Sequence, residues 1–257
     1  MKYIDIHAHL DFPDFDADRA EVIADMKAQG VGSINIGTTP DSSRASIRLA
    51  EENEHIWAIV GVHPVHAKEA QLSDIDEMES LLAHPKCVGI GECGLDFFRD
   101  ANDGETKALQ LSFFEKQIEL AIAHDKTLMI HCRQAYPETL DVLRSYKTSH
   151  PGLRANFHFF TEPIDTARTI LDLGFTVSFT GVVTFVKDYE NLVSFVPTDS
   201  LMIETDSPFV APKSVRGRRN DPRNVIEIAS KIAQIKQLEP DALAEVVRAN
   251  TSRIFGI

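Results

Sequence analysis

Short apolar runs alternate with longer amphipathic segments along the whole chain. The short runs are rich in β-branched residues and have the length of buried strands, whereas the longer segments repeat their apolar positions with a helical period. Glu105–His124 shows this period clearly, because Leu109, Phe113, Gln117 and Leu120 fall near one stripe. The pattern predicts eight strands, at Tyr3–Leu10, Val31–Thr38, Ile56–His63, Val88–Leu95, Thr127–Cys132, Arg154–Phe160, Phe175–Thr180 and Leu201–Asp206.

Predicted helices separate these strands, and two more helices follow the last strand. They cover Asp18–Gln29, Ser42–Asn53, Asp74–Leu82, Glu105–His124, Pro137–Tyr146, Ile164–Leu173, Lys187–Phe195, Arg223–Lys236 and Asp241–Asn250. Eight strand–helix units in 257 residues predict an α/β protein with one domain, a (β/α)8 TIM barrel over residues 1–257. A doubly wound open sheet has the same local pattern and is the alternative.

Composition narrows the class of protein. The chain is 43% hydrophobic and 25% charged, as globular proteins are, and its three cysteines cannot all pair in disulfides. No apolar run approaches the ~20 residues that span a bilayer, and the first residues do not resemble a secretory signal. We therefore expect a cytoplasmic protein without a membrane partner, and a monomer is compatible with this composition.

Charge adds one local feature. The net charge of −13 predicts a surface that repels nucleic acid on average. Residues 213–223 reverse the sign, with five basic residues and a single acidic one. This segment either binds an anion or is a solvated loop, and composition alone favours neither.

Imidazoles and carboxylates fall at the predicted carboxyl ends of five strands, where a TIM barrel places its reactive groups. They are His7, His9, Glu92, His131, His158 and Asp206. A single histidine at a strand end is more often a hydrogen-bonded residue than a ligand. Six such groups buried together without a cation would repel one another or stay unsatisfied. Because neutral imidazole and carboxylate suit divalent cations, the pattern predicts a metal site.

Three motifs accompany these residues in a fixed order. They are His-x-His at 7–9, Gly-Glu-Cys-Gly-Leu-Asp at 91–96 and Glu-Thr-Asp-Ser-Pro at 204–208. With His131 and His158 between the last two, the chain resembles TatD-type deoxyribonucleases of the metallo-dependent hydrolase superfamily over essentially its whole length. Residues 181–185 and 219–222 also resemble family segments, the latter with Asp221 where Glu is commoner.

The resemblance implies a deoxyribonuclease, similar to 3′–5′ exonucleases, that hydrolyses phosphodiesters in DNA with two divalent ions (Mg, Mn or Zn). One ion would bind His7, His9 and Asp206, and the other His131 and His158, with Glu92 bridging both. Two cations ~3.5–4 Å apart can activate water and stabilise both oxygens of an in-line displacement. Asp206 would also orient the attacking water and can accept its proton.

Other polar residues have weaker assignments. Glu204 shares the strand face of Asp206, so we expect it either to assist catalysis through a hydrogen bond to ligand or water, or to be a buried structural carboxylate. Asp5 stands in the same relation to His7, deeper in the barrel. His63 either lines the substrate mouth or caps its strand.

Basic residues are the expected substrate contacts. Arg133 follows the fifth predicted strand, and Arg216, Arg218 and Arg219 lie in the loop after the eighth, where barrel enzymes frequently bind phosphate. We expect these arginines to contact phosphates beside the metals, with Asn220 fixing the loop. The alternative is that they pair with surface acids. Glu162, where the family more often has Gly, adds negative charge near this site.

Two other functions are compatible with the barrel. An amidohydrolase, lactonase or deaminase acting on a small molecule would use the same fold and metals. The basic segment favours phosphate over a neutral amide. A non-catalytic binding or scaffold barrel would be expected to lack a ligand, and none of the six is missing.

Overall fold

Eight parallel strands form one sheet in chain order in the computed structural model, which describes residues 1–98 and 103–257. The eighth strand meets the first through a parallel bridge between Ala8 and Ser207. Two backbone hydrogen bonds reinforce this seam, from His9 N to Ser207 O (2.8 Å) and from Asp206 N to His7 O (2.9 Å). The sheet therefore forms the predicted TIM barrel, and its sequential strand order excludes the doubly wound alternative.

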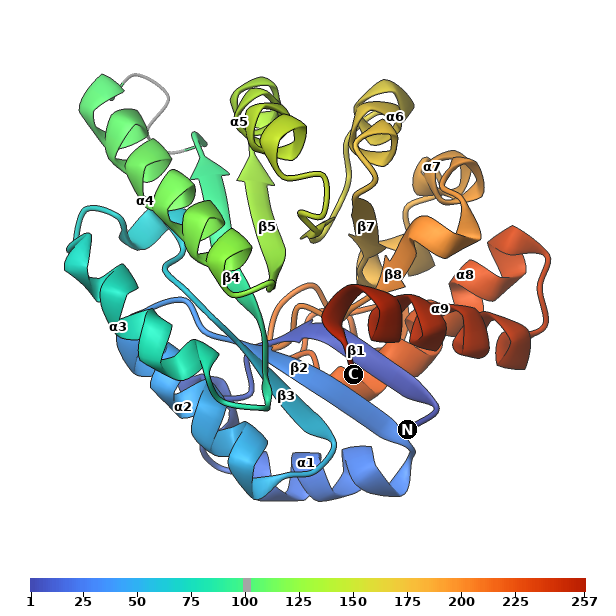
Figure 1. The fold of residues 1–257 in the computed structure, drawn as a ribbon. Coiled ribbons are helices and arrows are strands. Elements are labelled where there is room, and N and C mark those ends of the chain that lie inside the picture. Colours follow the sequence, from blue (N-terminus) through green and yellow to red (C-terminus); the bar gives the residue numbers. More distant parts are fainter. Residues whose placement is uncertain (99–102) are drawn as a thin grey trace.

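Helices form an outer ring around the strands (Figure 1). The strands are β1 (Tyr3–Ala8), β2 (Val31–Ile36), β3 (Ile56–Val60), β4 (Cys87–Asp96), β5 (Thr127–Arg133), β6 (Ala155–Phe157), β7 (Thr176–Phe179) and β8 (Leu201–Ile203). The helices are α1 (Arg19–Ala28), α2 (Pro40–Glu52), α3 (Ser73–Leu82), α4 (Gly104–Ala123), α5 (Tyr136–Ser149), α6 (Ile164–Asp172), α7 (Tyr189–Phe195), α8 (Val225–Lys236) and α9 (Pro240–Phe255).

Several strands end earlier than the sequence pattern predicts. β6 ends at Phe157 and β8 at Ile203, so His158 and Asp206 lie on the loops that follow. The backbone leaves the sheet there, because Phe159 and Asp206 adopt left-handed conformations with φ of 44° and 54°. The apolar pattern cannot detect this bend, because the loop residues His158, Phe160 and Asp206 are also buried.

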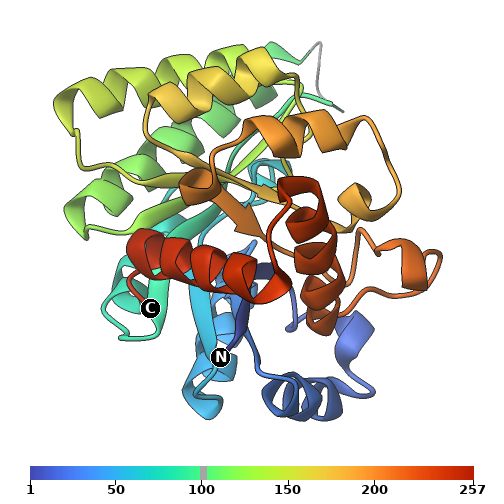
Figure 2. The same ribbon diagram turned by 90° about the vertical axis from the view of Figure 1, so that its right-hand side faces the viewer.

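The last helix is longer than predicted and continues to Phe255. Ile254 and Phe255 are buried with apolar side chains from six strands, including Ile4 and Val88 near the strand starts. Thr127, the first residue of β5, donates a hydrogen bond to the carbonyl of Ile254. The end of α9 therefore covers the amino-terminal end of the barrel, and the two views place both chain termini near this end (Figures 1 and 2).

A larger apolar cluster joins the outward faces of the strands to the helices, as in Phe157 of β6 with Ile170 of α6. With one barrel end covered by α9, the polar side chains gather at the carboxyl end of the strands. Within the described ranges, no helix combines the length and apolar character needed to cross a membrane.

Candidate metal centre

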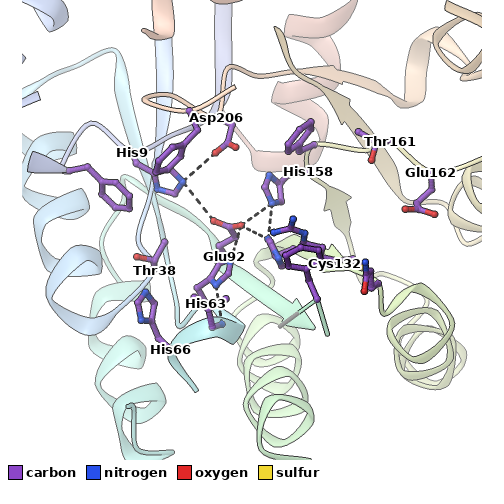
Figure 3. A pocket seen from close by; sticks show the side chains of 18 of the residues that line it. His9, Thr38, His63, His66, Glu92, Cys132, His158, Thr161, Glu162 and Asp206 are labelled. Atoms are coloured by element: carbon purple, nitrogen blue, oxygen red, sulfur yellow. Dashed lines mark hydrogen bonds and ion pairs between the residues drawn. The ribbon is translucent and has the colours of Figure 1, made fainter. Parts of the chain in front are cut away.

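The structure brings all six predicted ligand residues together at the carboxyl end of the barrel. They lie on or just after β1, β4, β5, β6 and β8, beside a pocket of about 670 Å³. Figure 3 shows Glu92 at the centre of this cluster, with His9 and Asp206 on one side and His158 on the other. Five of the six are buried, and His131 is half-buried at the pocket wall.

The two β1 histidines form one half of the site with Asp206. Their Nε2 atoms lie 3.2 Å apart and at 3.8 Å (His7) and 3.6 Å (His9) from Asp206 Oδ1. His9 Nδ1 lies 3.0 Å from the carbonyl oxygen of Ile36, which can only accept, so Nδ1 carries the proton. The His9 Nε2 lone pair is therefore free for a cation, an arrangement usual for metal-binding histidines.

Glu92 joins this half to a second one. Its Oε2 lies 3.4 Å from His7 Nε2. Its Oε1 lies 2.8 Å from both His131 Nδ1 and His158 Nε2. The two carboxylate oxygens thus face different histidine groups, which is the geometry a carboxylate needs to bridge two cations.

The donor set fits divalent cations. Ligand atoms of three overlapping groups lie within 4.8 Å of one another: His7, Glu92 and His158; His7, His9 and Asp206; and His63, Glu92 and His131. Imidazole nitrogens and carboxylate oxygens bind Zn²⁺, and the carboxylates also bind Mg²⁺ and Mn²⁺.

Glycines in β4 let Glu92 reach this position. A side chain on Gly94, where φ is +136°, would place its Cβ 2.0 Å from the carbonyl oxygen of His131, and one on Gly91 would meet that of Met129 at 2.5 Å. The β4–β5 register also shifts between Ile90 and Cys93, so β4 carries an extra residue there. Only glycine permits this close approach of β4 to β5.

Asp96 is a site residue to which the sequence analysis gave no role. Its Oδ2 lies 3.1 Å from His131 Nε2, while His131 Nδ1 faces Glu92. A carboxylate on the far nitrogen fixes the ring and its tautomer and makes the near nitrogen a better ligand. The sequence contained a signal for this role, because Asp96 lies four residues after Glu92 on the same strand.

His63 lies beside Glu92, closer to the centre of the metal-ligand cluster than expected for a residue at the mouth of the pocket. Its Nε2 is 3.2 Å from Glu92 Oε1, and its Nδ1 accepts a hydrogen bond from the Val65 amide at 3.1 Å. Because Nδ1 accepts, a neutral His63 carries its proton on Nε2 and presents a donor to the site. Burial lowers the pKa of His63 to about 4, so the ring is neutral at pH 7.

Glu204 is fully buried behind His158 and does not line the pocket. Its Oε1 accepts from the Phe159 amide and its Oε2 from the Ser178 hydroxyl, both at 2.6 Å. Its Oε1 also lies 3.5 Å from His158 Nδ1, an ion-pair distance without hydrogen-bond geometry. These contacts hold the loop that carries His158, as expected of a structural carboxylate, and a catalytic role for Glu204 stays a prediction.

Asp5 is also fully buried, but β1 is irregular after Asp5, so its side chain and that of His7 are not simply related by strand alternation. The β1–β2 register shifts between Asp5 and Ala8. Asp5 Oδ1 accepts from the amides of His7 (3.2 Å) and Thr205 (2.9 Å). Asp5 thus ties β1 to the segment before Asp206.

The charges of the cluster shift the pKa values of its members in opposite directions. Burial alone would raise the pKa of Glu92, but the surrounding imidazoles, His158 foremost, hold it well below its usual value. Burial would lower the pKa of His158, yet Glu92 and Glu204 outweigh it and raise this pKa well above 6.5. Without a cation, therefore, a proton on His158 compensates the charge of Glu92.

We expect metal occupancy to fall with decreasing pH, beginning above the ordinary imidazole pKa of ~6.5. The raised pKa of His158 means that the metal-free site takes up a proton there, and a cation must displace it. Chelator-competition titrations across a pH series measure the affinity. Calorimetry in buffers of different ionisation enthalpy measures the proton release. A metal affinity that does not change between pH 8 and pH 5 would contradict histidine ligation.

The predicted basic substrate contacts separate into two groups. Arg133 lines the pocket, and its guanidinium lies 3.7 Å from the ring centroid of Phe98. In the described part of the chain, the residues lining this pocket do not include Arg216, Arg218, Arg219 or Asn220. Arg216 lies over the ring of Phe185, and Arg218 donates to the carbonyl of Ser214.

Arg219 and Asn220 have partners within the protein, and their contact with substrate stays a prediction. Arg219 forms a bidentate ion pair with Asp18, both bonds 2.7 Å long. Asn220 is fully buried and donates to the carbonyls of Thr205 (2.9 Å) and Phe209 (2.6 Å). Asn220 therefore fixes the loop, as expected, but it does so from inside the protein.

Arg219→Ala is expected to leave kcat and KM within about threefold of the parent, since the side chain is engaged by Asp18 away from the pocket. The pair is partly exposed, so its loss should lower the melting temperature only slightly. Steady-state kinetics and thermal unfolding measure both effects. A large rise in KM at unchanged melting temperature would return Arg219 to the substrate path.

Known proteins resemble this chain over essentially its whole length. Residues 4–256 match the profile of the TatD-related DNase family. An uncharacterized metal-dependent hydrolase, YabD, of Bacillus subtilis (strain 168) is 35% identical over 98% of both chains. The 3′-5′ ssDNA/RNA exonuclease TatD of Citrobacter rodentium is 33% identical over 98% of this chain and 97% of its own. The crystal structure of the Escherichia coli TatD homologue YjjV superimposes with a TM-score of 0.91 at 23% identity, covering 100% of this chain and 98% of the other.

Proposed function

The chain belongs to the TatD-related DNase family and is a metal-dependent hydrolase, and we propose that it removes nucleotides from the 3′ end of single-stranded DNA. The observation that carries the proposal is Glu92, whose two oxygens face two separate groups of histidines. Two cations held in this way suit an in-line displacement at phosphorus. The relative named as a 3′-5′ ssDNA/RNA exonuclease supports the choice of substrate.

We assign each side chain a role in this reaction. His7, His9 and Asp206 would hold one ion, and His131 and His158 the other, with Glu92 between them. When bound, these ions would lower the pKa of a water molecule and polarise the phosphate. Asp206, at the pocket wall, is placed to accept a proton from the attacking water.

Two further residues would act on the substrate itself. His63 presents its Nε2–H beside Glu92, where it can donate to a phosphate oxygen or to the departing oxygen. Arg133, at the pocket wall, can contact the phosphate with its permanent positive charge. Glu162 lines the same pocket and disfavours additional phosphates on that side.

The test uses metal-stripped protein and a single-stranded oligonucleotide labelled at its 5′ end. We expect Mg²⁺, Mn²⁺ or Zn²⁺, added singly, to restore a ladder of products shortened by one nucleotide at a time. A phosphorothioate at the 3′-terminal linkage should block this ladder, whereas a phosphorothioate at the 5′-terminal linkage should not. A panel of lactones, amides and aminopurines tests the small-molecule alternative. Turnover of that panel without cleavage of any oligonucleotide would overturn the proposal.

A further inference from the structure

Two phenylalanines at the mouth of the pocket are unusually exposed. Phe98 is 47% and Phe209 is 50% exposed, and both line the pocket that contains Glu92. Among the described residues, these are the two Phe, Tyr or Trp side chains that are exposed rather than buried or half-buried. Leaving two rings in water at one site costs free energy, so a partner that covers them is expected.

The backbone holds Phe209 in place. Its amide donates to the carbonyl of Asp206 at 2.9 Å, and its carbonyl accepts from the buried Asn220 side chain at 2.6 Å. Its ring meets Phe12 edge to face at 6.1 Å, and Phe12 stacks on His9 with centroids 4.6 Å apart. Phe12, Phe209 and His9 therefore form a continuous aromatic surface beside the metal centre.

Phe98 forms a second surface with Arg133. Its amide donates to Asp96 Oδ1 at 2.9 Å, and the Arg133 guanidinium lies 3.7 Å from its ring centroid. This pair follows β4 and ends β5, whereas Phe12 and Phe209 follow β1 and β8. In a barrel of eight sequential strands, those two pairs of strands stand on opposite sides, so the metal centre lies between the two surfaces.

We propose that the Phe12–Phe209 surface and the Phe98–Arg133 pair stack the two nucleobases that flank the bond to be cut, in an extension of the proposed nuclease function. Aromatic rings and guanidinium groups bind every base through its face, without selecting sequence. Stacking also resolves the charge conflict, because a chain with a net charge of −13 gains affinity from the bases themselves. Bases paired in a duplex are covered by their neighbours, so the surfaces select unpaired ends.

The experiment compares Phe209→Leu and Phe98→Leu, which keep apolar bulk but remove the flat ring, with the parent. We expect KM for a single-stranded oligonucleotide to rise roughly 5- to 150-fold, the range for losing one base–aromatic stack, with kcat changed only a few-fold. Phe209→Tyr should restore the KM. Leu72→Ala, an exposed apolar residue outside the pocket, is the matched control and should behave as the parent.

An abasic nucleotide next to the bond to be cut separates stacking from a structural role. It should raise KM for the parent and add little for the Leu variant whose ring faced the missing base, because both changes remove the same contact, whereas the two losses should add for the other Leu variant. Losses that are fully additive for both variants would overturn the stacking proposal, as would unchanged KM values. A phosphorothioate oligonucleotide carrying 2-aminopurine gives a readout without turnover, since stacking quenches its fluorescence. If the parent neither binds nor cuts any oligonucleotide, the nuclease function itself fails, and the two failures are thus distinguishable.

Discussion

Glu92→Gln is expected to lower kcat/KM for single-stranded DNA at least ~100-fold and to reduce the metal bound per chain. Glutamine has the same shape but no negative charge. It can offer one oxygen but not two, so it cannot serve both the His7 side and the His131–His158 side. Losses of this size follow removal of single electrostatic groups at other hydrolytic sites.

Metal content by mass spectrometry and kinetics over a range of cation concentrations test this prediction. Adding excess cation should restore little activity, because the variant lacks the bridging carboxylate and a higher ion concentration does not replace it. Circular dichroism and thermal unfolding of the metal-free proteins control for folding. Parent-like activity with full metal content would refute the bridging role.

Asp206→Asn is expected to reduce kcat at least ~100-fold while leaving much of the metal bound. His7, His9 and Glu92 still offer donors on that side of the site, whereas the carboxylate that can accept the proton of the attacking water is gone. The substitution keeps the volume of the side chain. The hydrogen bond between the Asp206 amide and the His7 carbonyl is also unaffected, so the seam between β1 and β8 should persist.

Metal content distinguishes this variant from Glu92→Gln, because Asp206→Asn removes the proton acceptor but keeps the carboxylate that faces both histidine groups. Glu77→Gln, a carboxylate exposed on α3, controls for the loss of one negative charge. A kcat within tenfold of the parent would show that Asp206 does not accept the proton.

The local pattern was sufficient for the architecture and for the donors at the strand ends. Strands and helices are specified by apolar periods that each segment carries by itself. The barrel then follows from eight such units, and placing His7, His9, Glu92 and His131 requires only that parallel strands end at one rim. For this reason the six predicted ligand residues meet, although the lengths of β6 and β8 were overestimated.

The partners of individual side chains were decided by tertiary structure. Arg219 looked like a phosphate contact in a basic loop, but its carboxylate partner Asp18 lies 201 residues away along the chain. Glu204 shares a strand pattern with Asp206, yet the backbone turns at Asp206, and only the latter reaches the pocket. Neither outcome has a local signal, because a side chain takes whichever partner the closed barrel brings within hydrogen-bond distance.

The sequence by itself determined which chemical groups this protein carries: imidazoles and carboxylates at one end of a barrel, and hence the prediction of a divalent-metal site. Tertiary structure alone decided how that chemistry is arranged. It set which Glu92 oxygen faces which histidine, made Asp96 the partner of His131, and joined Phe12 to Phe209 across the seam. The physical reason is that periodicity fixes the direction of a side chain relative to its own strand or helix, whereas distances of 3 to 6 Å between segments depend on register shifts, glycine contacts and loop bends.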